Sequence, residues 1–409
     1  MVKKIIDRWL EIYAARVHSM RSSAARDLMS TASRPDIISF AGGMPAEESL
    51  DDEAFRQAVL NVVKNSSGRA FQYGPTEGFY EVRELACRLM RRSGLKVHPD
   101  EVLITAGAQQ ALDLIAKTFI DEGDEIIVEA PSYVGALNAF RVFQPQVISV
   151  EIEDDGINVD SLQTTLQSKS VPPKFIYLIP NFQNPAGVTI SMEKRKKIAA
   201  LATDYNVLVI EDNPYGEISF EGKQLPTLRS MCDNVIYLGS LSKIISPGLR
   251  VGWIYAPLPI LQKINLAKQG ADLCSSSLSQ LVALEYLSLI DLDEHLEKIR
   301  KLYRERCEAM LQALEEFFPD EARWTKPDGG FFIWVTVDAE IDTGDMLSLA
   351  LEKKVAYIPG SSFYYGAGGQ KSMRLSFSNP KPDQIYDGIE RLAGVLKEQI
   401  ALSKSIYGF

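Results

Sequence analysis

The stretch LGSLSKIISPGLRVGW (residues 238–253) places a lysine in a segment whose neighbours have the pattern of a buried strand. Lys243 follows Ser242 and precedes a Pro-Gly pair and Arg250. A buried ammonium group is unfavourable unless its charge is paired or removed. The alternative is an exposed lysine that packs only its aliphatic stem, and the flanking pattern disfavours it. The stretch therefore predicts that a chemical partner engages Lys243.

Short β-rich runs alternate with helical patterns from about residue 101 onward. This alternation is typical of stacked βαβ units around a mostly parallel sheet, so we expect an α/β fold. In such sheets, functional residues gather at the carboxyl ends of the strands. The expected strands cover residues 101–105, 124–130, 174–180, 206–212, 234–240 and 250–256.

The chain has 409 residues, which exceeds the size at which one hydrophobic core usually keeps growing, so two subdomains are expected. A helical pattern that begins near Asp293 leads into a C-terminal α+β part, with expected strands at 329–337 and 372–378. We place the boundary near residue 298. The expected division is an N-terminal segment, 1–60, a large domain, 61–297, and a small C-terminal domain, 298–409.

The composition is that of an ordinary globular protein, with 46% hydrophobic and 24% charged residues. Lys and Arg number 44 against 54 Asp and Glu, and the net charge of -10 gives no general attraction for phosphate backbones or anionic lipid. Residues 1–20 carry charges at intervals and resemble neither a secretory signal nor a membrane anchor. We therefore expect a cytoplasmic protein with no nucleic-acid or membrane partner.

The cysteines and histidines lie far apart in the sequence. No CxxC pair occurs, which favours reduced and mostly buried thiols. No zinc site or histidine-based triad can be assembled from local spacing, so no metal is expected. The residues are Cys87, Cys232, Cys274 and Cys307, with His18, His98 and His295.

A first candidate binding element is TAGAQQALDLIAKTFI, residues 105–120, which has the pattern of a strand end, a turn of small residues and a helix. The backbone N–H groups at such a helix start suit a phosphate. A tight strand-to-helix turn by itself also explains Gly107. The stretch does not match GxGxxG, so a dinucleotide site lacks its main support.

Two further strand ends carry polar residues. PNFQNPAG (180–187) presents Asn184 ahead of a proline, and VIEDNPYG (209–216) puts Asp212 at the end of an apolar strand, three residues before Tyr215. Taken singly, Asn184 is better explained by a capping or turn role than by a functional one, and Asp212 could simply cap the next segment, so each signal alone is ambiguous.

The ordered set of these elements resembles the fold-type I pyridoxal 5'-phosphate enzymes. The turn suited to phosphate, Asn-Pro-x-Gly, the strand-end Asp with a nearby Tyr, and Ser-x-Ser-Lys with an Arg seven residues later follow one another as in that family. The resemblance covers nearly the whole chain and is closest to class I/II aminotransferases, in the 2-aminoadipate, kynurenine and multisubstrate branch. It implies a large domain that binds pyridoxal phosphate, a smaller α+β C-terminal domain, and an N-terminal segment that closes over the substrate.

The resemblance assigns roles around the cofactor ring. It implies that Lys243 forms a Schiff base with the cofactor aldehyde and, once displaced, moves a proton between the substrate Cα and the cofactor C4'. Asp212 matches the carboxylate that keeps the pyridine nitrogen protonated. Tyr215 and Asn184 match the pair on the phenolic oxygen, with Asn184 also facing the substrate, and Tyr133 in EAPSYVG matches the aromatic stacked on the ring.

The resemblance also implies a phosphate site. The backbone of Ala108, the side chain of Gln109, the hydroxyls of Ser240 and Ser242, and the guanidinium of Arg250 would hold the anion. Ala108 departs from the hydroxyl residue that is common there, so one side-chain hydrogen bond is expected to be missing.

Four residues are implied to meet the substrate. Tyr73 in FQYGPTEG matches a tyrosine that reaches the cofactor and substrate of the neighbouring subunit, which implies a homodimer with shared sites. Arg374 in SMRLSFS matches the arginine that grips the substrate α-carboxylate. Within residues 23–45, Gly43 matches a backbone position of the pocket and Arg26 an arginine for a distal carboxylate. A surface salt bridge is the alternative for Arg26.

We therefore expect a homodimeric aminotransferase that moves an α-amino group from an L-amino acid to a 2-oxo acid. The expected donors are of the 2-aminoadipate, glutamate, aromatic or branched-chain type, and 2-oxoglutarate is the expected acceptor. One alternative is another fold-type I enzyme, a β-eliminating lyase or a decarboxylase. A second is the cofactor-sensing domain of a transcription regulator, which the acidic charge and the short stretch before FAGG (40–43) disfavour. A third is an inactive scaffold of the same fold, which the joint presence of these residues disfavours.

Overall fold

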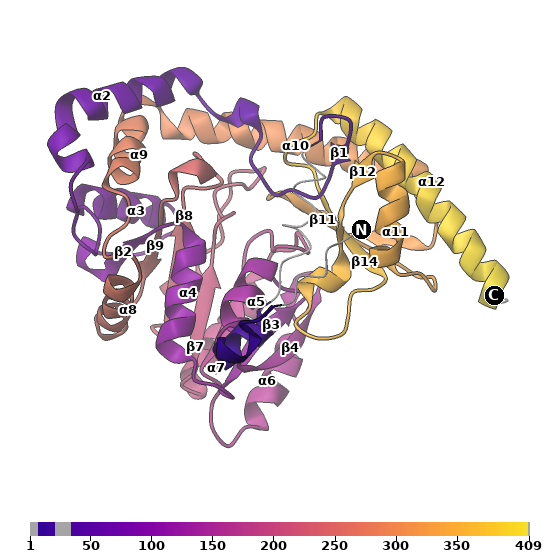
Figure 1. Ribbon diagram of the computed structural model, residues 1–409, viewed down its shortest axis with the longest axis horizontal. Helices are drawn as coiled ribbons and strands as arrows, with labels where there is room; N and C mark the ends of the chain where they lie inside the picture. Colours follow the sequence, from indigo (N-terminus) through magenta and orange to yellow (C-terminus); the bar gives the residue numbers. More distant parts are fainter. Residues whose placement is uncertain (1–6, 21–33, 408–409) are drawn as a thin grey trace.

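The computed structural model describes residues 7–20 and 34–407, with an eight-stranded sheet at its centre (Figure 1). The strand order is β2-β9-β8-β7-β6-β3-β4-β5. Neighbours from β8 to β4 run parallel, whereas β9 is antiparallel to both of its neighbours and β5 is antiparallel to β4. The strands are β2 Val102–Thr105, β3 Glu125–Ala130, β4 Gln146–Glu153, β5 Gly156–Ile157, β6 Phe175–Leu178, β7 Leu208–Asp212, β8 Val235–Ser240 and β9 Gly252–Tyr255.

All six strands expected in the large sheet are present, and the mostly parallel sheet is confirmed. Strands β6, β8 and β9 are buried along their whole length, as expected for a sheet covered on both faces. The sequence prediction missed β4 and β5. Most of β4 is exposed or only partly buried, and its sequence QVISVEIE lacks the apolar run that marks a buried strand.

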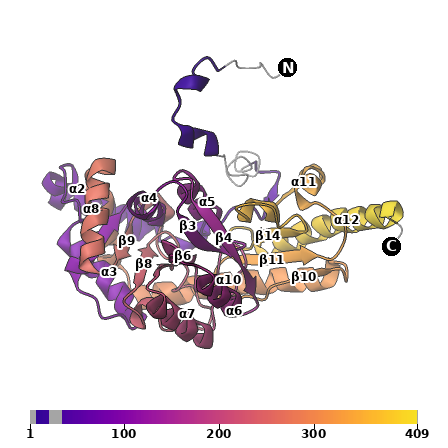
Figure 2. The ribbon, with the colours of Figure 1, turned by 90° about the horizontal axis from the view of Figure 1, so that it is seen from below.

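Helices cover both faces of the large sheet. Figure 2 shows α4 and α5 on one side of it and α6 and α7 on the other. A pair of long helices, α2 and α9, packs together at the end of the sheet that carries β2 and β9 (Figure 1). The helices of this part are α2 Asp52–Ala70, α3 Tyr80–Arg92, α4 Ala108–Phe119, α5 Val134–Arg141, α6 Val159–Gln167, α7 Met192–Asp204, α8 Leu258–Asp272 and α9 Ser277–Leu289.

A second, smaller sheet forms the C-terminal part, as expected. It is antiparallel in the order β10-β11-β14-β13, and α10, α11 and α12 pack around it. The N-terminal β1 (Ile38–Ser39) returns to this part and pairs with β12 (Val355–Ala356). The other elements are α10 Leu292–Phe317, β10 Ala322–Trp324, β11 Phe332–Val337, α11 Thr343–Glu352, β13 Ile358–Pro359, β14 Ser372–Ser376 and α12 Pro382–Tyr407.

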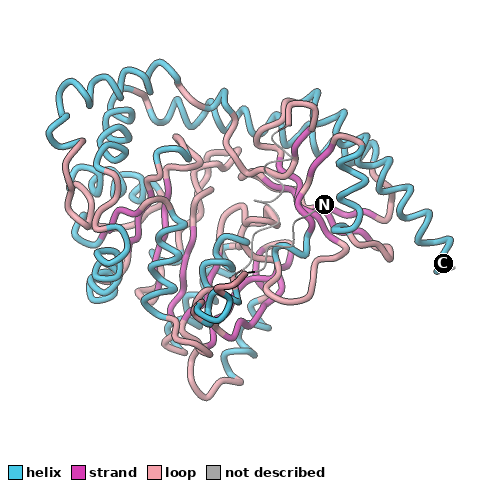
Figure 3. Tube along the Cα trace, in the orientation of Figure 1, coloured by secondary structure: helices cyan, strands magenta, loops and turns pink. Residues whose placement is uncertain are grey.

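One unbroken helix, α10, runs across residue 298, where we placed the domain boundary. The division into domains therefore stays a prediction. Figure 3 shows loops gathered in the middle of the molecule, between the strands of the two sheets. These loops follow the carboxyl ends of the parallel strands, which is where the predicted site residues lie.

Two general features complete the fold. All four cysteines are free, and all but Cys274 are buried, which confirms the prediction of reduced thiols. Of the helices in the part of the chain that the structure describes, none is both long enough and apolar enough to cross a bilayer.

Candidate active site

Lys243 lies three residues beyond the end of β8, on a turn that faces the C-terminal part. Its ammonium nitrogen donates a hydrogen bond to the carbonyl oxygen of Gly43, 2.8 Å away. The same nitrogen lies 5.9 Å from the ring centroid of Tyr215 and 5.6 Å from that of Phe331. The stretch 238–253 therefore places Lys243 among residues from three distant parts of the sequence.

The surroundings of Lys243 shift its ionisation toward the neutral amine. Burial lowers the pKa of Lys243 to about 8, and the positive charges of Arg374 and Arg250 act in the same direction. Roughly a tenth of the side chain is then the neutral amine at pH 7. A neutral amine is the form that attacks an aldehyde or accepts a proton, so this environment suits both tasks.

Asp212 ends strand β7 and is almost fully buried. Its Oδ2 accepts a hydrogen bond of 2.8 Å from the hydroxyl of Tyr177, whereas its Oδ1 has no partner among the residues that the structure describes. Burial raises the pKa of Asp212 to about 6, and the bond from Tyr177 opposes that rise. A buried carboxylate oxygen without a donor is costly, so Oδ1 is suited to an N–H group of a ligand.

Arg374, on strand β14, is buried between the two sheets. Its Nη1 donates to Oδ1 of Asn184 at 2.9 Å and its Nη2 to the carbonyl oxygen of Ala41 at 2.5 Å. Its guanidinium carbon lies 4.2 Å from the ring centroid of Phe332 and 5.0 Å from that of Phe363.

Arg374 is not paired with a carboxylate of the described residues. No ion pair of Arg374 occurs within residues 7–20 and 34–407, and its Nε has no partner there. Burial lowers its pKa to about 10. A buried guanidinium with spare donors is the geometry that a carboxylate fork satisfies.

Tyr215 and Asn184 meet beside these groups. The Tyr215 hydroxyl and the Asn184 side chain are hydrogen-bonded, and burial raises the pKa of Tyr215 well above its usual range. The Tyr215 ring packs edge-on against Phe331 and Phe332. Tyr133, at the start of α5, donates a hydrogen bond of 3.3 Å to Oε1 of Gln109.

The turn before α4 leaves its backbone open. Gly107 has φ of +76°, and a Cβ atom there would lie 2.4 Å from Nη2 of Arg250, so a larger residue would be strained and would displace the end of the Arg250 side chain. Ala108 begins the helix, and Arg250 donates to the carbonyl oxygen of Ala106 at 3.1 Å. The guanidinium of Arg250 thus lies beside the start of α4.

Ser240 and Ser242 are hydrogen-bonded to one another. The two hydroxyl oxygens lie 2.9 Å apart, and the Ser242 N–H also donates to the Ser240 hydroxyl at 3.1 Å. Both side chains are buried at the end of β8. On α4, the side chain of Gln109 donates a hydrogen bond of 2.8 Å to the carbonyl oxygen of Gly135.

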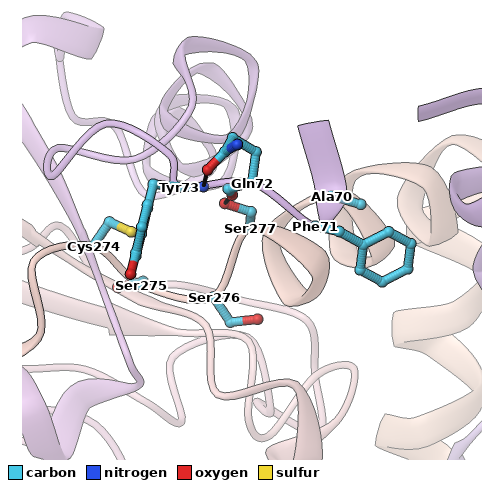
Figure 4. Close-up of a pocket in the computed structure, with 8 residues that line it drawn as sticks. All are labelled: Ala70, Phe71, Gln72, Tyr73, Cys274, Ser275, Ser276 and Ser277. Atoms are coloured by element: carbon cyan, nitrogen blue, oxygen red, sulfur yellow. Dashed lines mark hydrogen bonds between the residues drawn. The ribbon is translucent and has the colours of Figure 1, made fainter. Parts of the chain in front are cut away.

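One predicted site residue, Tyr73, is not part of this cluster, and another, Arg26, lies outside the residues that the structure describes. Tyr73 lies on the surface with 78% of its area exposed, in a pocket formed with Cys274 and Ser275 (Figure 4). Its backbone N–H donates to the side chain of Gln72 at 2.9 Å. Such a position is open to a second subunit but does not reach Lys243 of the same chain.

Sequence reasoning missed three residues behind the site. Tyr177 contacts Asp212, while Glu129 and Gln183 hold the loop that bears Asn184. A charged residue inside the apolar run DEIIVEA (124–130) is the signal that points to Glu129, because buried glutamates are rare unless they are paired.

The sequence profile described as "Aminotransferase class I and II" matches residues 35–392, which include every residue of this cluster. The chain belongs to the class I and II aminotransferases. The aminotransferase is 41% identical over 394 residues to aromatic-amino-acid aminotransferase 1 of Thermococcus litoralis, covering 95% of this chain and 94% of that protein.

Two solved structures are similar over nearly their whole length. The alpha-aminoadipate aminotransferase of Thermus thermophilus, complexed with N-(5'-phosphopyridoxyl)-L-leucine, has a TM-score of 0.90 and 38% identity, covering 96% of this chain and 99% of that one. The Pyrococcus horikoshii kynurenine aminotransferase, in complex with PMP, has a TM-score of 0.91 and 40% identity, with the same coverage. The aminotransferase thus has the fold-type I architecture and uses pyridoxal 5'-phosphate.

Proposed function

We propose that this aminotransferase transfers the α-amino group of an L-amino acid to 2-oxoglutarate, with Lys243, Asp212 and Arg374 at the centre of its site. The observation that carries the proposal is the joint presence of an amine with a lowered pKa, a buried carboxylate oxygen without a donor, and a buried guanidinium without a carboxylate. Each lacks the partner that cofactor or substrate would supply. The similarity to an alpha-aminoadipate, an aromatic and a kynurenine aminotransferase supports the donor classes.

The residues fit the cofactor. The orphaned Oδ1 of Asp212 suits the pyridine N–H, and the amine of Lys243 suits the aldehyde. Tyr215 and Asn184 would hold the phenolic oxygen, and Tyr133 would stack on the ring. When bound, pyridoxal phosphate supplies the electron sink that stabilises a carbanion at the substrate Cα.

The phosphate would lie at the start of α4. We assign it to the backbone N–H of Ala108, the side chain of Gln109, the Ser240 and Ser242 hydroxyls and the guanidinium of Arg250. The positive end of the helix dipole and the fork of Arg250 both favour an anion there. Since Ala108 has no hydroxyl, one side-chain hydrogen bond to the phosphate would be missing there.

Arg374 would bind the substrate carboxylate and so fix the Cα proton relative to Lys243. In its neutral form, the amine of Lys243 would be placed to accept this proton and to give it back. The rings of Tyr215 and Phe331, whose centroids lie 5.9 and 5.6 Å from the amine nitrogen, shield it in part from water, and this burial lowers its pKa.

The substrate side chain would meet two kinds of surroundings. Aromatic side chains, with Gly43 opposite Phe332, suit an apolar or aromatic donor. A Cβ atom at Gly43 would lie 2.6 Å from Cζ of Phe332, so a larger residue there would displace the ring. We assign recognition of a distal carboxylate, as in 2-aminoadipate or 2-oxoglutarate, to Arg26.

We also propose a cytoplasmic homodimer with shared sites. Tyr73 would reach the cofactor and substrate of the second subunit. Exposed apolar residues lie on α2 and α8 and directly after them, and the segments that follow these two helices also line the Tyr73 pocket, as expected for a face that is covered in the assembly. They are Leu60, Val63, Phe71, Leu266 and Leu273.

The absorption spectrum of the purified protein tests the proposed function. It is titrated with glutamate, 2-aminoadipate, phenylalanine and leucine, one at a time. Conversion of the bound pyridoxal band to that of the pyridoxamine form is the expected result, and its extent ranks the donors. A pyridoxal band that no donor converts, with release of ammonia or CO₂ instead, would favour the lyase or the decarboxylase.

A further inference from the structure

We propose that Glu129 is a positioning residue that fixes Asn184 and, through it, Arg374, and that it thereby sets the affinity for the substrate carboxylate. The inference rests on the proposed function, because it takes Arg374 as the group that binds this carboxylate. Glu129 contacts neither Asn184 nor Arg374 directly. It acts through the loop that bears Asn184.

Glu129 sits where two neighbouring strands separate. Strands β3 and β6 pair at Val128 and Tyr177, one residue before Glu129. Beyond this point the Glu129 carboxylate replaces the strand partner, because its Oε2 accepts the backbone N–H of Ile179 at 3.0 Å. The same oxygen accepts a hydrogen bond of 3.2 Å from Nε2 of Gln183. One carboxylate oxygen thus ties the start of the loop to its middle.

Gln183 passes this restraint to the loop on either side. Its Nε2 also donates to the carbonyl oxygen of Pro131 at 2.9 Å, and its Oε1 accepts the N–H of Ala186 at 2.8 Å. Asn184, the next residue, is therefore held from both sides. Its Oδ1 accepts a hydrogen bond from Nη1 of Arg374. A shift of Asn184 would move one of the two anchors that orient the guanidinium.

The Glu129 carboxyl is shielded from solvent. Only 1% of its area is exposed, and its Oε1 has no partner among the described residues. Burial raises its pKa to about 8, and the negative charge of Asp212 contributes. The carboxyl is thus mainly neutral at pH 7, and glutamine is a close copy of it: one oxygen remains to accept both hydrogen bonds.

The test measures ligand binding to the holoenzyme without turnover. α-Methylleucine has no Cα proton, so it binds without completing the reaction, whereas isopentylamine has the same side chain and no carboxylate. Both dissociation constants are read from the change in the cofactor spectrum. For Glu129→Ala we expect about tenfold weaker binding of α-methylleucine and a change under twofold for isopentylamine. Glu129→Gln should restore the affinity to within about threefold of the wild type.

The matched control is Glu211→Gln, the same substitution at another fully buried glutamate that holds backbone N–H groups away from the site. It should leave both dissociation constants unchanged. If Glu129→Ala does not fold, Gln183→Met interrupts the same connection and should show the same selective loss. Equal losses for both ligands, no loss for α-methylleucine, or failure of Glu129→Gln to restore it would overturn the proposal. If the wild type bound α-methylleucine no more tightly than isopentylamine, the proposed function itself would be wrong.

Discussion

Glu211 and Asp212 are consecutive residues at the end of β7, and both are fully buried carboxylic acids whose pKa values burial raises. They differ in how their oxygens are satisfied. Glu211 accepts the backbone N–H groups of Leu228 and Arg229, one on each oxygen, both at 2.9 Å. Asp212 accepts one hydrogen bond from Tyr177 and keeps its other oxygen without a donor among the described residues.

The difference arises because successive side chains of a strand point to opposite faces of the sheet. Glu211 holds the segment Thr227–Ser230 against the sheet, and its hydrogen bonds are complete within the chain. Asp212 faces the site, and its hydrogen bonds are complete only with a ligand. Burial and raised pKa values are common to both residues, so these two neighbours are separated by the unsatisfied oxygen of Asp212 together with the side of the sheet that it faces.

The largest effect is expected on the site side, at Lys243. Lys243→Ala removes the amine that carries the proton, so the rate of the amino-transfer half reaction should fall by at least about 10⁴-fold, while the melting temperature changes little. Single-turnover absorbance and thermal unfolding measure the two quantities. An unchanged half-reaction rate would contradict the assignment of Lys243.

The comparison is tested next at Asp212 itself. Asp212→Asn keeps the shape but removes the charge that would hold the pyridine nitrogen protonated. The half-reaction rate should fall about 10²- to 10³-fold. Stopped-flow absorbance with the best donor measures the rate, and a loss below fivefold would place Asp212 with Glu211 as a structural acid.

The opposite outcome is expected one residue earlier. Glu211→Gln replaces one of two acceptors with an NH₂ group that faces a backbone N–H, so the free energy of unfolding should fall by about 1–3 kcal/mol. The rate of the folded enzyme should stay within about twofold of the wild type. Urea unfolding followed by circular dichroism, together with the half-reaction rate, separates the two effects. A large rate loss without destabilisation would remove the distinction between the two carboxylates.

A smaller effect is expected at Tyr177, whose hydroxyl stabilises the ionised form of Asp212. Tyr177→Phe removes this bond, which lowers the pKa of Asp212, so the pKa should rise in the variant. The ionised form is required, and activity is lost as pH falls through this pKa. The acid limb of the pH–rate profile should therefore move to higher pH by about one unit. A limb that stays in place would show that Tyr177 does not act on Asp212.

The sequence was sufficient for the features that depend on local pattern. The buried strands, and the positions of Lys243, Asp212 and Asn184 at or after strand ends, followed from apolar runs and turn residues, whereas the roles of these residues followed only from the resemblance of their ordered set to a known family. Contacts between distant segments did not follow. Glu129 meets Ile179 only because β3 and β6 are neighbours, although β4, β5 and α6 lie between them in the sequence. The exposed strand β4 carried too weak an apolar signal to be predicted.

The central claim is that Asp212, and not its neighbour Glu211, is the acid that completes its hydrogen bonds with the cofactor. Reconstituting the wild type, Asp212→Asn and Glu211→Gln with ¹⁵N-labelled pyridoxal phosphate and recording the chemical shift of the ring nitrogen by NMR at pH 7.5 tests it directly. We expect a protonated nitrogen in the wild type and Glu211→Gln and an unprotonated one in Asp212→Asn. The same shift in all three proteins would contradict the account.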